Sequence, residues 1–361
     1  MIQQLLDDLV DSGREIGIQV ATYVHGRLAL EAHAGSADTA TGWMVDEKTF
    51  FPSYSTGKGI AALVVAVLVE RGVLDYAAPV AAYWPEFGAH GKESITVGDV
   101  LTHRAGLPSL PADLSVEQFT DVAGVTAWLA EQRPEWEPGT ATGYHGWSYG
   151  HLVAEIVRRA TGRPIDAVLD EIATPLGIEG QLYFALPDGV RAATLYDGNW
   201  SAVLNYMPPA FHRVAPPAVA PTADFANRPE IRRLAVPAAA TITARGAARL
   251  YAAALSGELL SPSTLYEATA LRTTDPDRVL GGPIPKAHGF FLGGPGSPMG
   301  TNPTIFGRNG SGGSIAFADP EHGLALAVTH NRLAAGPEDC VNQVVAAVRR
   351  ELGFGSAVTA D

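Results

Sequence analysis

The sequence has little cysteine and few basic residues, and each scarcity excludes a class of protein. Among 361 residues there is one cysteine, Cys340, so an internal disulfide and a paired-cysteine metal site are excluded. Lysine and arginine total 25 against 38 acidic residues, giving a formal net charge of −13. This balance argues against nucleic acid or an anionic membrane as the main partner, because both require a basic face.

Long apolar runs are also missing. The longest, Gly59 to Val69, is shorter than the roughly 18 residues needed to span a bilayer and is typical of a buried core helix. The first residues, Met1 to Asp8, lack the basic and apolar regions of a signal peptide. We therefore expect a soluble, cytoplasmic protein.

Apolar residues themselves are plentiful. Hydrophobic residues make up 47% of the chain and charged residues 17%, so the chain can bury a large core and is not disordered. At roughly 150 residues per domain, the length suggests about two domains.

The two ends of the chain carry similar patterns. Residues 2–12 have helical spacing, and residues 16–33 form two β-prone runs around a His-Gly pair, which predicts a hairpin. Residues 314–329 predict a second hairpin, and residues 337–352 a final helix. The economical arrangement is one antiparallel sheet built from both ends and flanked by both terminal helices.

The middle of the chain is mostly helical. The clearest helical patterns cover residues 96–102, 116–131 and 148–161. We therefore predict an α+β protein, with residues 1–75 and 235–361 forming the sheet domain and residues 76–234 an inserted, mainly helical domain.

A proline-rich stretch, residues 207–229, lies within this insertion. We expect it to contain no regular element and to be either a surface linker or a lid over a site. A second stretch, residues 281–303, is rich in glycine and proline.

A Ser-x-x-Lys motif, Ser55-Thr56-Gly57-Lys58, uses one of only four lysines in the chain. A strongly apolar helix follows it, which places Ser55 at a helix N-terminus and Lys58 on the same helical face. A buried lysine there can lose its proton and act as a base for the serine. The alternative is a serine that caps the helix beside an exposed lysine.

A rival motif, Gly146-Trp147-Ser148-Tyr149-Gly150, matches the nucleophile elbow of α/β-hydrolases. That elbow requires a buried strand directly before it, whereas turn-forming residues precede this motif. We interpret Ser148 as the N-cap of a helix.

Several spaced motifs resemble the serine β-lactamase-like superfamily, and more closely the class C β-lactamase-like esterases known as family VIII carboxylesterases. The likeness spans roughly residues 20–350. The segments that carry it are Phe51 to Lys58, Leu74-Asp75, Tyr83 to Phe87, Gly91-Lys92, Ile95 to Val97, Leu101 to Pro108, Pro138-Gly139, Tyr144, Thr174 to Gly177, Gly307 to Ser314 and Phe317 to Pro320.

The resemblance implies a β-lactamase-like fold with its site between the sheet domain and the helical insertion. It implies that Ser55 is the acylated nucleophile, that Lys58 is its partner, and that Tyr144 occupies the family's Tyr-x-Asn motif. A phenol held near a cationic Lys58 can have a lowered pKa and take the serine proton. The alternative is that Tyr144 is a core tyrosine.

The family's third motif corresponds to Arg308-Asn309-Gly310, which we expect to contribute to substrate binding. The resemblance implies an oxyanion hole formed by the backbone N–H groups of Ser55 and Ser311. Gly310 would let the substrate approach the backbone closely. The alternative is a flexible Gly/Ser loop.

Two positions depart from the family pattern. Gly146 stands where the Tyr-x-Asn asparagine would be, so a side-chain amide that helps to bind an acyl amide is missing, and we expect esters to be preferred over β-lactams. Arg308 provides a fixed charge and a planar fork suited to a carboxylate. It either anchors an acidic substrate group or pairs with a neighbour. His145 either lines the pocket or supports it from behind.

The function we expect is hydrolysis of carboxylic esters through an acyl-enzyme on Ser55. The alternatives are an acyltransferase that passes the acyl group to an alcohol or amine, and a non-catalytic binding protein on the same fold. The ten histidines show no metal-ligand spacing and no nucleotide-binding motif occurs, so we expect no metal and no cofactor. The expected partner is a small ester or acyl substrate, and the sequence leaves the oligomeric state open.

Overall fold

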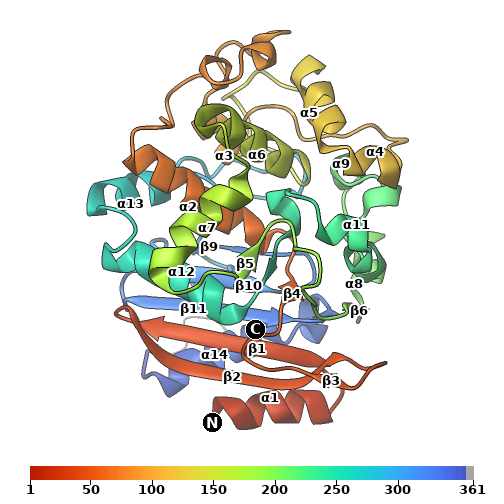
Figure 1. The fold of residues 1–361 in the computed structure, drawn as a ribbon, viewed down its shortest axis with the longest axis vertical. Coiled ribbons are helices and arrows are strands. Elements are labelled where there is room, and N and C mark those ends of the chain that lie inside the picture. Colours follow the sequence, from red (N-terminus) through yellow and green to blue (C-terminus); the bar gives the residue numbers. More distant parts are fainter. Residues whose placement is uncertain (355–361) are drawn as a thin grey trace.

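The computed structural model describes residues 1–354, in which strands from the two ends of the chain lie side by side in one sheet (Figure 1). Helical segments from the middle of the chain occupy the opposite end of the molecule. Residues 355–361, which the sequence analysis assigns to the sheet domain, lie outside the described residues.

The main sheet has seven strands in the order β3-β2-β1-β11-β10-β9-β8, and every neighbouring pair is antiparallel. Its strands are β1 (Gly17–Val24), β2 (Arg27–Asp38), β3 (Trp43–Met44), β8 (Phe291–Leu292), β9 (Phe306–Asn309), β10 (Ile315–Asp319) and β11 (Leu324–His330). Strands β1 and β11 pair along their length, from Ile18 with His330 to Val24 with Leu324. The predicted α+β class and the antiparallel sheet from both ends are confirmed.

Turn chemistry fixes the first hairpin. His25 and Gly26 connect β1 to β2 and both have positive φ, at 47° and 77°. Two successive residues in this conformation form the tight turn whose twist matches antiparallel strands. The His-Gly pair was therefore a sound sequence signal for this hairpin.

Successive side chains along each strand point to opposite faces of the sheet, so each face packs against a different set of helices. On β11, Leu326 and Val328 face the terminal helices α1 (Ile2–Asp11) and α14 (Val341–Glu351). The alternate residues Ala325 and Ala327 face the opposite side of the sheet, in a second hydrophobic core that includes helix α12 (Ala244–Ser256). Small side chains on that face let α12 pack closely against the strands, whereas larger ones fill the space under the terminal helices.

Helix α2 (Thr56–Glu70) runs through the centre of the molecule, and its residues from Thr56 to Leu68 are all buried. It packs against β9, α6, α7, α12 and α13. The other α-helices are α3 (Val97–Leu101), α4 (Val116–Thr120), α5 (Val122–Glu131), α6 (Ser148–Thr161), α7 (Ile165–Ala173), α8 (Trp200–Leu204), α9 (Pro209–Val214), α10 (Ala223–Asn227), α11 (Pro229–Arg232) and α13 (Pro262–Thr269). Within residues 1–354, no helix is long and apolar enough to cross a membrane.

Two small sheets complete the fold. Strands β4 (Phe51–Pro52), β7 (Thr241–Ile242) and β5 (Leu182–Tyr183) pair in that order just before α2, and β6 (Tyr196–Asp197) pairs in parallel with β12 (Arg332–Leu333). The β4–β7 pairing fixes the chain as it enters the first turn of α2.

Two expectations about the middle of the chain were wrong. The helix predicted for residues 116–131 is two helices, because the chain turns at Asp121, whose side chain accepts the Gly124 N–H and caps α5. The stretch 207–229 contains the regular elements α9 and α10. Proline is tolerated in the first turn of a helix, where its missing N–H has no helical partner, so Pro209 can begin α9.

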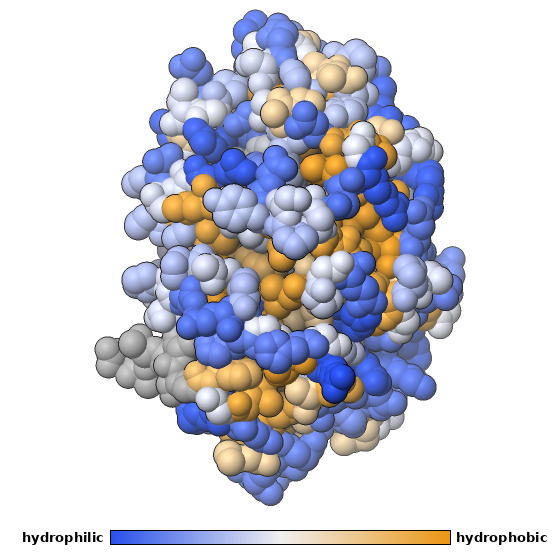
Figure 2. Space-filling model, turned by 90° about the vertical axis from the view of Figure 1, so that its left-hand side faces the viewer, coloured by the Kyte–Doolittle hydropathy of each residue, from blue (hydrophilic) through white to orange (hydrophobic). Residues whose placement is uncertain are grey.

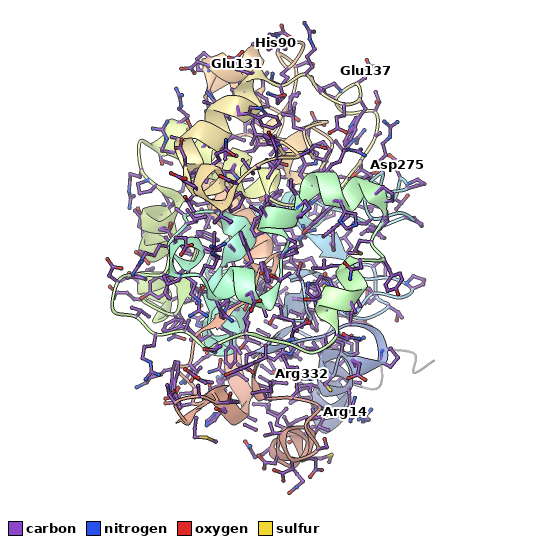
Figure 3. The ribbon with its side chains drawn as sticks, turned by 90° about the vertical axis from the view of Figure 1, so that its right-hand side faces the viewer. Arg14, His90, Glu131, Glu137, Asp275 and Arg332 are labelled. Carbon is purple, nitrogen blue, oxygen red and sulfur yellow. The ribbon has the colours of Figure 1, made fainter. Side chains whose placement is uncertain are left out.

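Polar side chains occupy much of the face of the molecule that Figure 2 shows. The face in Figure 2 is mostly hydrophilic, with apolar residues in patches between polar ones. Several polar side chains labelled in Figure 3 lie at the two ends of the molecule: His90 faces Glu131 at 3.2 Å at the helical end, and Arg332 donates to the backbone carbonyl of Arg14 at 3.2 Å near the sheet.

A buried ion pair ties the last helix to the sheet and predicts a large loss of stability when it is broken. Arg349 on α14 donates to Asp319 on β10 at 2.8 Å, and both are buried. Arg349→Leu would leave the Asp319 carboxylate without its buried partner, so we expect the free energy of unfolding in urea to fall by roughly 3–5 kcal/mol.

The matched control is Arg158→Leu, which removes the half-exposed partner of Glu155 on the surface of α6. We expect a cost of roughly 1 kcal/mol or less there. Equal costs for the two variants would contradict the anchoring role of Arg349.

Candidate active site

A sharp backbone turn places Ser55 at the start of α2. The Ser53 N–H donates to the Ala240 carbonyl at 2.8 Å, which extends the β4–β7 pairing up to the turn. Tyr54 then adopts a positive φ of 45°, unusual for a residue with a large side chain. Ser55 is the N-cap residue of α2 and is 8% exposed. Such strain is common where the surrounding structure holds a functional group in place.

Two side chains converge on the Ser55 hydroxyl. Lys58 Nζ lies 2.7 Å from Ser55 Oγ, as expected for positions three residues apart on one helical face. Tyr144 Oη lies 2.6 Å from the same oxygen, although it is 89 positions away in sequence. The structure thus brings together the three residues that the sequence analysis put forward as catalytic.

Lys58 is buried without a counter-ion. It is 1% exposed, and no carboxylate within residues 1–354 lies at ion-pair distance from its ammonium nitrogen. Burial, and secondly the positive charge of Arg308, hold the pKa of Lys58 well below its usual value. Both effects favour the neutral amine, the form that accepts a proton.

The pKa of Tyr144 moves in the opposite direction from our expectation. Burial raises the pKa of its phenol, and the Arg308 charge and the hydrogen bond with Ser55 offset this only in part. A lowered pKa was expected from a cationic Lys58, but the burial of Lys58 disfavours that charge. Tyr144 is therefore a neutral phenol that can donate and accept at the same oxygen.

A second buried lysine has the carboxylate partner that Lys58 lacks. Lys286 Nζ lies 3.1 Å from Asp277 Oδ2, and both side chains are buried. Asp277 Oδ1 accepts the backbone N–H of Tyr144 at 3.0 Å, so the pair also fixes the backbone that carries the phenol. No sequence motif marked Asp277 or Lys286, because they meet Tyr144 only in the folded chain.

Arg308 lies beneath the site. Its side chain is 1% exposed, its guanidinium stacks 3.7 Å from the centre of the Phe291 ring, and Nη2 lies 3.2 Å from His103 Nε2. No carboxylate within the described residues forms an ion pair with it. Its charge therefore acts on the neighbouring Lys58 and Tyr144 rather than on a group in the open pocket.

Two backbone N–H groups near the Ser55 hydroxyl are available to bind an anion. Among residues 1–354, the N–H groups of Ser55 and Ser311 donate to no protein acceptor. The loop that carries Ser311 is held by the Gly310 N–H, which donates to the Ser314 carbonyl at 2.7 Å, and by Thr56 Oγ1, which donates to the same carbonyl at 3.0 Å. Two fixed donors beside a serine are suited to the oxyanion of a tetrahedral intermediate.

Gly310 is required by the close packing of this loop against the turn before Ser55. A Cβ atom at position 310 would lie 2.1 Å from the Ser53 carbonyl oxygen. A side chain there would therefore force this loop and the turn before Ser55 apart.

A small pocket of about 20 Å³ opens beside Ser55. Its lining includes the Ser55, Lys58 and Tyr144 side chains, the loop residue Ser311, and apolar side chains from the proline-rich stretch. The full lining is Tyr54, Ser55, Lys58, Tyr144, Gly146, Trp147, Phe211, Val214, Ala215, Pro221, Ala238 and Ser311. The stretch 207–229 thus covers this pocket, one of the two roles considered for it. No local pattern singled out Phe211, Val214 or Trp147 as pocket residues.

The remaining candidates lie outside the pocket. Asn309 is exposed at the end of β9. His145 is buried behind the site, where Nε2 accepts the Leu107 N–H at 2.9 Å and Nδ1 lies 2.7 Å from the Gly143 carbonyl. Ser148 is fully buried, and its hydroxyl lies 3.4 Å from the Pro108 carbonyl. Ser148 was expected to cap α6, but Trp147 occupies the N-cap position and makes no side-chain cap.

One group in the described part of the chain has the spacing of metal ligands: Asp319 at the end of β10, with Glu321 and His322 in the turn that follows. Asp319 already receives hydrogen bonds from Arg349 and from the His322 ring. This arrangement accounts for the cluster without an ion.

Comparison with known proteins agrees with this geometry. The family model described as Beta-lactamase matches residues 2–349. The chain is 33% identical over 345 residues to the esterase/beta-lactamase LipL of Mycobacterium tuberculosis (strain ATCC 25618 / H37Rv), which covers 88% of this chain and 77% of that protein. It is 30% identical over 218 residues to esterase EstB of Burkholderia gladioli, covering 55% of this chain and 54% of EstB.

Solved structures give the same result. A crystal structure of a family VIII carboxylesterase superimposes with a TM-score of 0.87 at 31% identity, covering 97% of this chain and 96% of that one. A penicillin-binding protein homolog from Caulobacter crescentus superimposes with a TM-score of 0.86 at 32% identity, with the same coverage.

The different surroundings of the two buried lysines predict opposite stability effects. The pKa of Lys58 is lower in the folded than in the unfolded chain, so native Lys58 reduces stability at pH values below its unfolded pKa of roughly 10.4. At pH 7 we expect Lys58→Met to leave the free energy of unfolding unchanged or to raise it by up to roughly 2 kcal/mol.

Lys286→Met is the matched control, because it leaves Asp277 buried and unpaired and should cost roughly 3–5 kcal/mol. Urea unfolding of both variants measures the difference. A loss in Lys58→Met as large as that in Lys286→Met would mean that Lys58 is a stabilised cation.

Proposed function

Since the chain belongs to the beta-lactamase family, we propose that it is a serine hydrolase that cleaves carboxylic esters through an acyl-enzyme on Ser55. The observation that carries the proposal is the placement of Ser55 Oγ within 2.7 Å of Lys58 Nζ and 2.6 Å of Tyr144 Oη. A nucleophile, a base and two free backbone donors then surround one small pocket.

Acylation uses the neutral Lys58. Its amine takes the Ser55 proton as Oγ attacks the ester carbonyl carbon, and the carbonyl oxygen becomes an oxyanion held by the Ser55 and Ser311 amides. When the tetrahedral intermediate collapses, the bond to the alcohol oxygen breaks. The Tyr144 hydroxyl gives its proton to that oxygen and is reprotonated from Lys58. The products are a neutral alcohol and Ser55 acylated at Oγ.

Deacylation repeats these steps with water as the nucleophile. Lys58, neutral again, takes a proton from the water through Tyr144 while the water attacks the acyl carbon. The bond between the acyl carbon and Ser55 Oγ then breaks, Lys58 returns the proton to Oγ through Tyr144, and the free carboxylic acid leaves.

Two observations favour esters over β-lactams. Gly146 provides no side-chain amide to hold an acyl amide group, and the pocket beside Ser55 is too small for a bulky acyl chain. EstB is named as an esterase, which supports this assignment, whereas LipL is named as both an esterase and a beta-lactamase. An ester with a small acyl group needs only the nucleophile, the base and the two amides.

The covered pocket favours acyl transfer as a second candidate. Phe211, Val214 and Pro221 shield Ser55 from bulk water, and an acyl-enzyme that excludes water can pass its acyl group to an alcohol or amine. Product analysis with added alcohols separates the two: a transferase forms a new ester in preference to the free acid.

We expect the choice of nucleophile to be visible in two serine variants. Ser55→Ala removes the attacking oxygen and should lower kcat/KM on phenyl acetate by several orders of magnitude. Ser148→Ala should retain most of the activity, because that hydroxyl is buried against Pro108. The reverse pattern would refute the assignment, and intact-mass detection of an acetyl group on the native protein provides independent evidence.

The proposed base also predicts a pH profile. Lys58 must be neutral to accept the proton, so kcat/KM should rise with pH through the lowered pKa of Lys58 and then level off. Arg308→Met removes a neighbouring positive charge that disfavours protonation of Lys58. The rising limb should then move to higher pH by on the order of one unit.

The control for this prediction is Arg104→Met, a change of the same kind outside the groups that shift the pKa of Lys58. Its profile should keep the native midpoint. An unmoved midpoint in Arg308→Met would contradict the role of the Arg308 charge.

A further inference from the structure

Building on the proposed esterase function, we propose that Val214 sets the upper limit on acyl size: seated against Gly146, its side chain closes the pocket to acyl groups longer than acetyl. Val214 is the last residue of α9, within the proline-rich stretch. It lines the pocket together with Ser55 and Tyr144.

The contact between Val214 and Gly146 depends on the missing side chain at position 146. A Cβ atom on Gly146 would lie 2.4 Å from Val214 Cγ1, closer than two carbon atoms can approach. Even alanine at position 146 would therefore displace Val214. Val214 fills the space beside Tyr144 that a side chain at position 146 would need.

Hydrogen bonds hold this wall in place. The Leu110 N–H donates to the Arg213 carbonyl at 3.0 Å, next to Val214. Further along the stretch, Trp147 Nε1 donates to the Val219 carbonyl at 2.9 Å, and the Tyr54 hydroxyl donates to the Thr222 carbonyl. Because Tyr54 and Trp147 also line the pocket, the site itself anchors the covering segment.

The remaining space fits one small group. The pocket measures about 20 Å³, and a single water molecule needs roughly 10–15 Å³ of such space. On this proposal the methyl group of an acetyl ester occupies this space, and the two further methylenes of a butyryl chain would be directed against Val214 and Phe211, which line the same pocket. One methylene more or less in an apolar pocket changes kcat/KM by roughly 10–200-fold.

The first experiment compares kcat/KM on phenyl acetate and phenyl butyrate. We expect the native protein to prefer the acetate, and Val214→Ala to raise the butyrate-to-acetate ratio by about tenfold or more. Val219→Ala is the matched control: it makes the same truncation at a buried position of the same segment that does not line the pocket. Its ratio should stay within about twofold of the native value.

The second experiment tests the contact directly through the pair Gly146→Ala and Val214→Ala. Gly146→Ala alone should displace the wall and lower the midpoint of thermal unfolding. In the Val214→Ala background Cγ1 is gone, so the same change should cost much less. This coupling is measured without any substrate.

The outcomes separate the two proposals. If no phenyl ester acylates Ser55 of the native protein, the esterase function fails, and this inference fails with it. If esters acylate Ser55 but the chain-length profile is flat, or Val214→Ala and Val219→Ala shift the ratio equally, only the role of Val214 is refuted. Equal costs of Gly146→Ala in the two backgrounds would refute the contact itself.

Discussion

The burial of Lys58, for which residues 1–354 provide no counter-ion, is the constraint on which the rest of the site depends. An ammonium group in this position would lack both water and a carboxylate, so the folded protein favours the neutral amine. Helix α2 provides the dry environment, because its residues around Lys58 are buried on all sides. The hydrophobic core that stabilises the fold therefore also lowers the pKa of Lys58 and keeps its amine able to accept a proton.

The neighbouring charges extend this effect. Arg308 keeps its charge even when buried, because guanidinium has a much higher pKa than an amine and spreads its charge over a planar group that stacks on Phe291. The charge of Lys286, by contrast, is balanced by the carboxylate of Asp277, with which it forms an ion pair. Arg308 therefore remains a fixed cation next to Lys58, and it opposes protonation of the amine.

Local spacing and turn chemistry made part of this structure predictable. Ser55 and Lys58 meet because they are three residues apart on one helix, and the hairpin at His25 follows from the conformation of two turn residues. Tyr144 became a candidate only through the family resemblance, since 89 positions separate it from Ser55 and no local pattern connects them.

Other features of the site could not be predicted because they depend on packing between distant segments. The raised pKa of Tyr144 and the burial of Arg308 result from surroundings that exist only in the folded chain. The helices in the stretch 207–229 were missed because proline content was taken as incompatible with helix, although proline suits a first turn.

Four of the segments that line the site divide its work. The start of α2, the segment around Tyr144 and the loop around Ser311 carry the polar groups proposed to form and break bonds. The fourth segment, α9 and the residues after it, contributes only apolar side chains and is held by hydrogen bonds to its own backbone carbonyls. Those bonds survive a change of side chain, so apolar residues such as Val214 can vary without moving Ser55, Lys58 or Tyr144. A protein built in this way can change its acyl substrate while keeping the same chemistry.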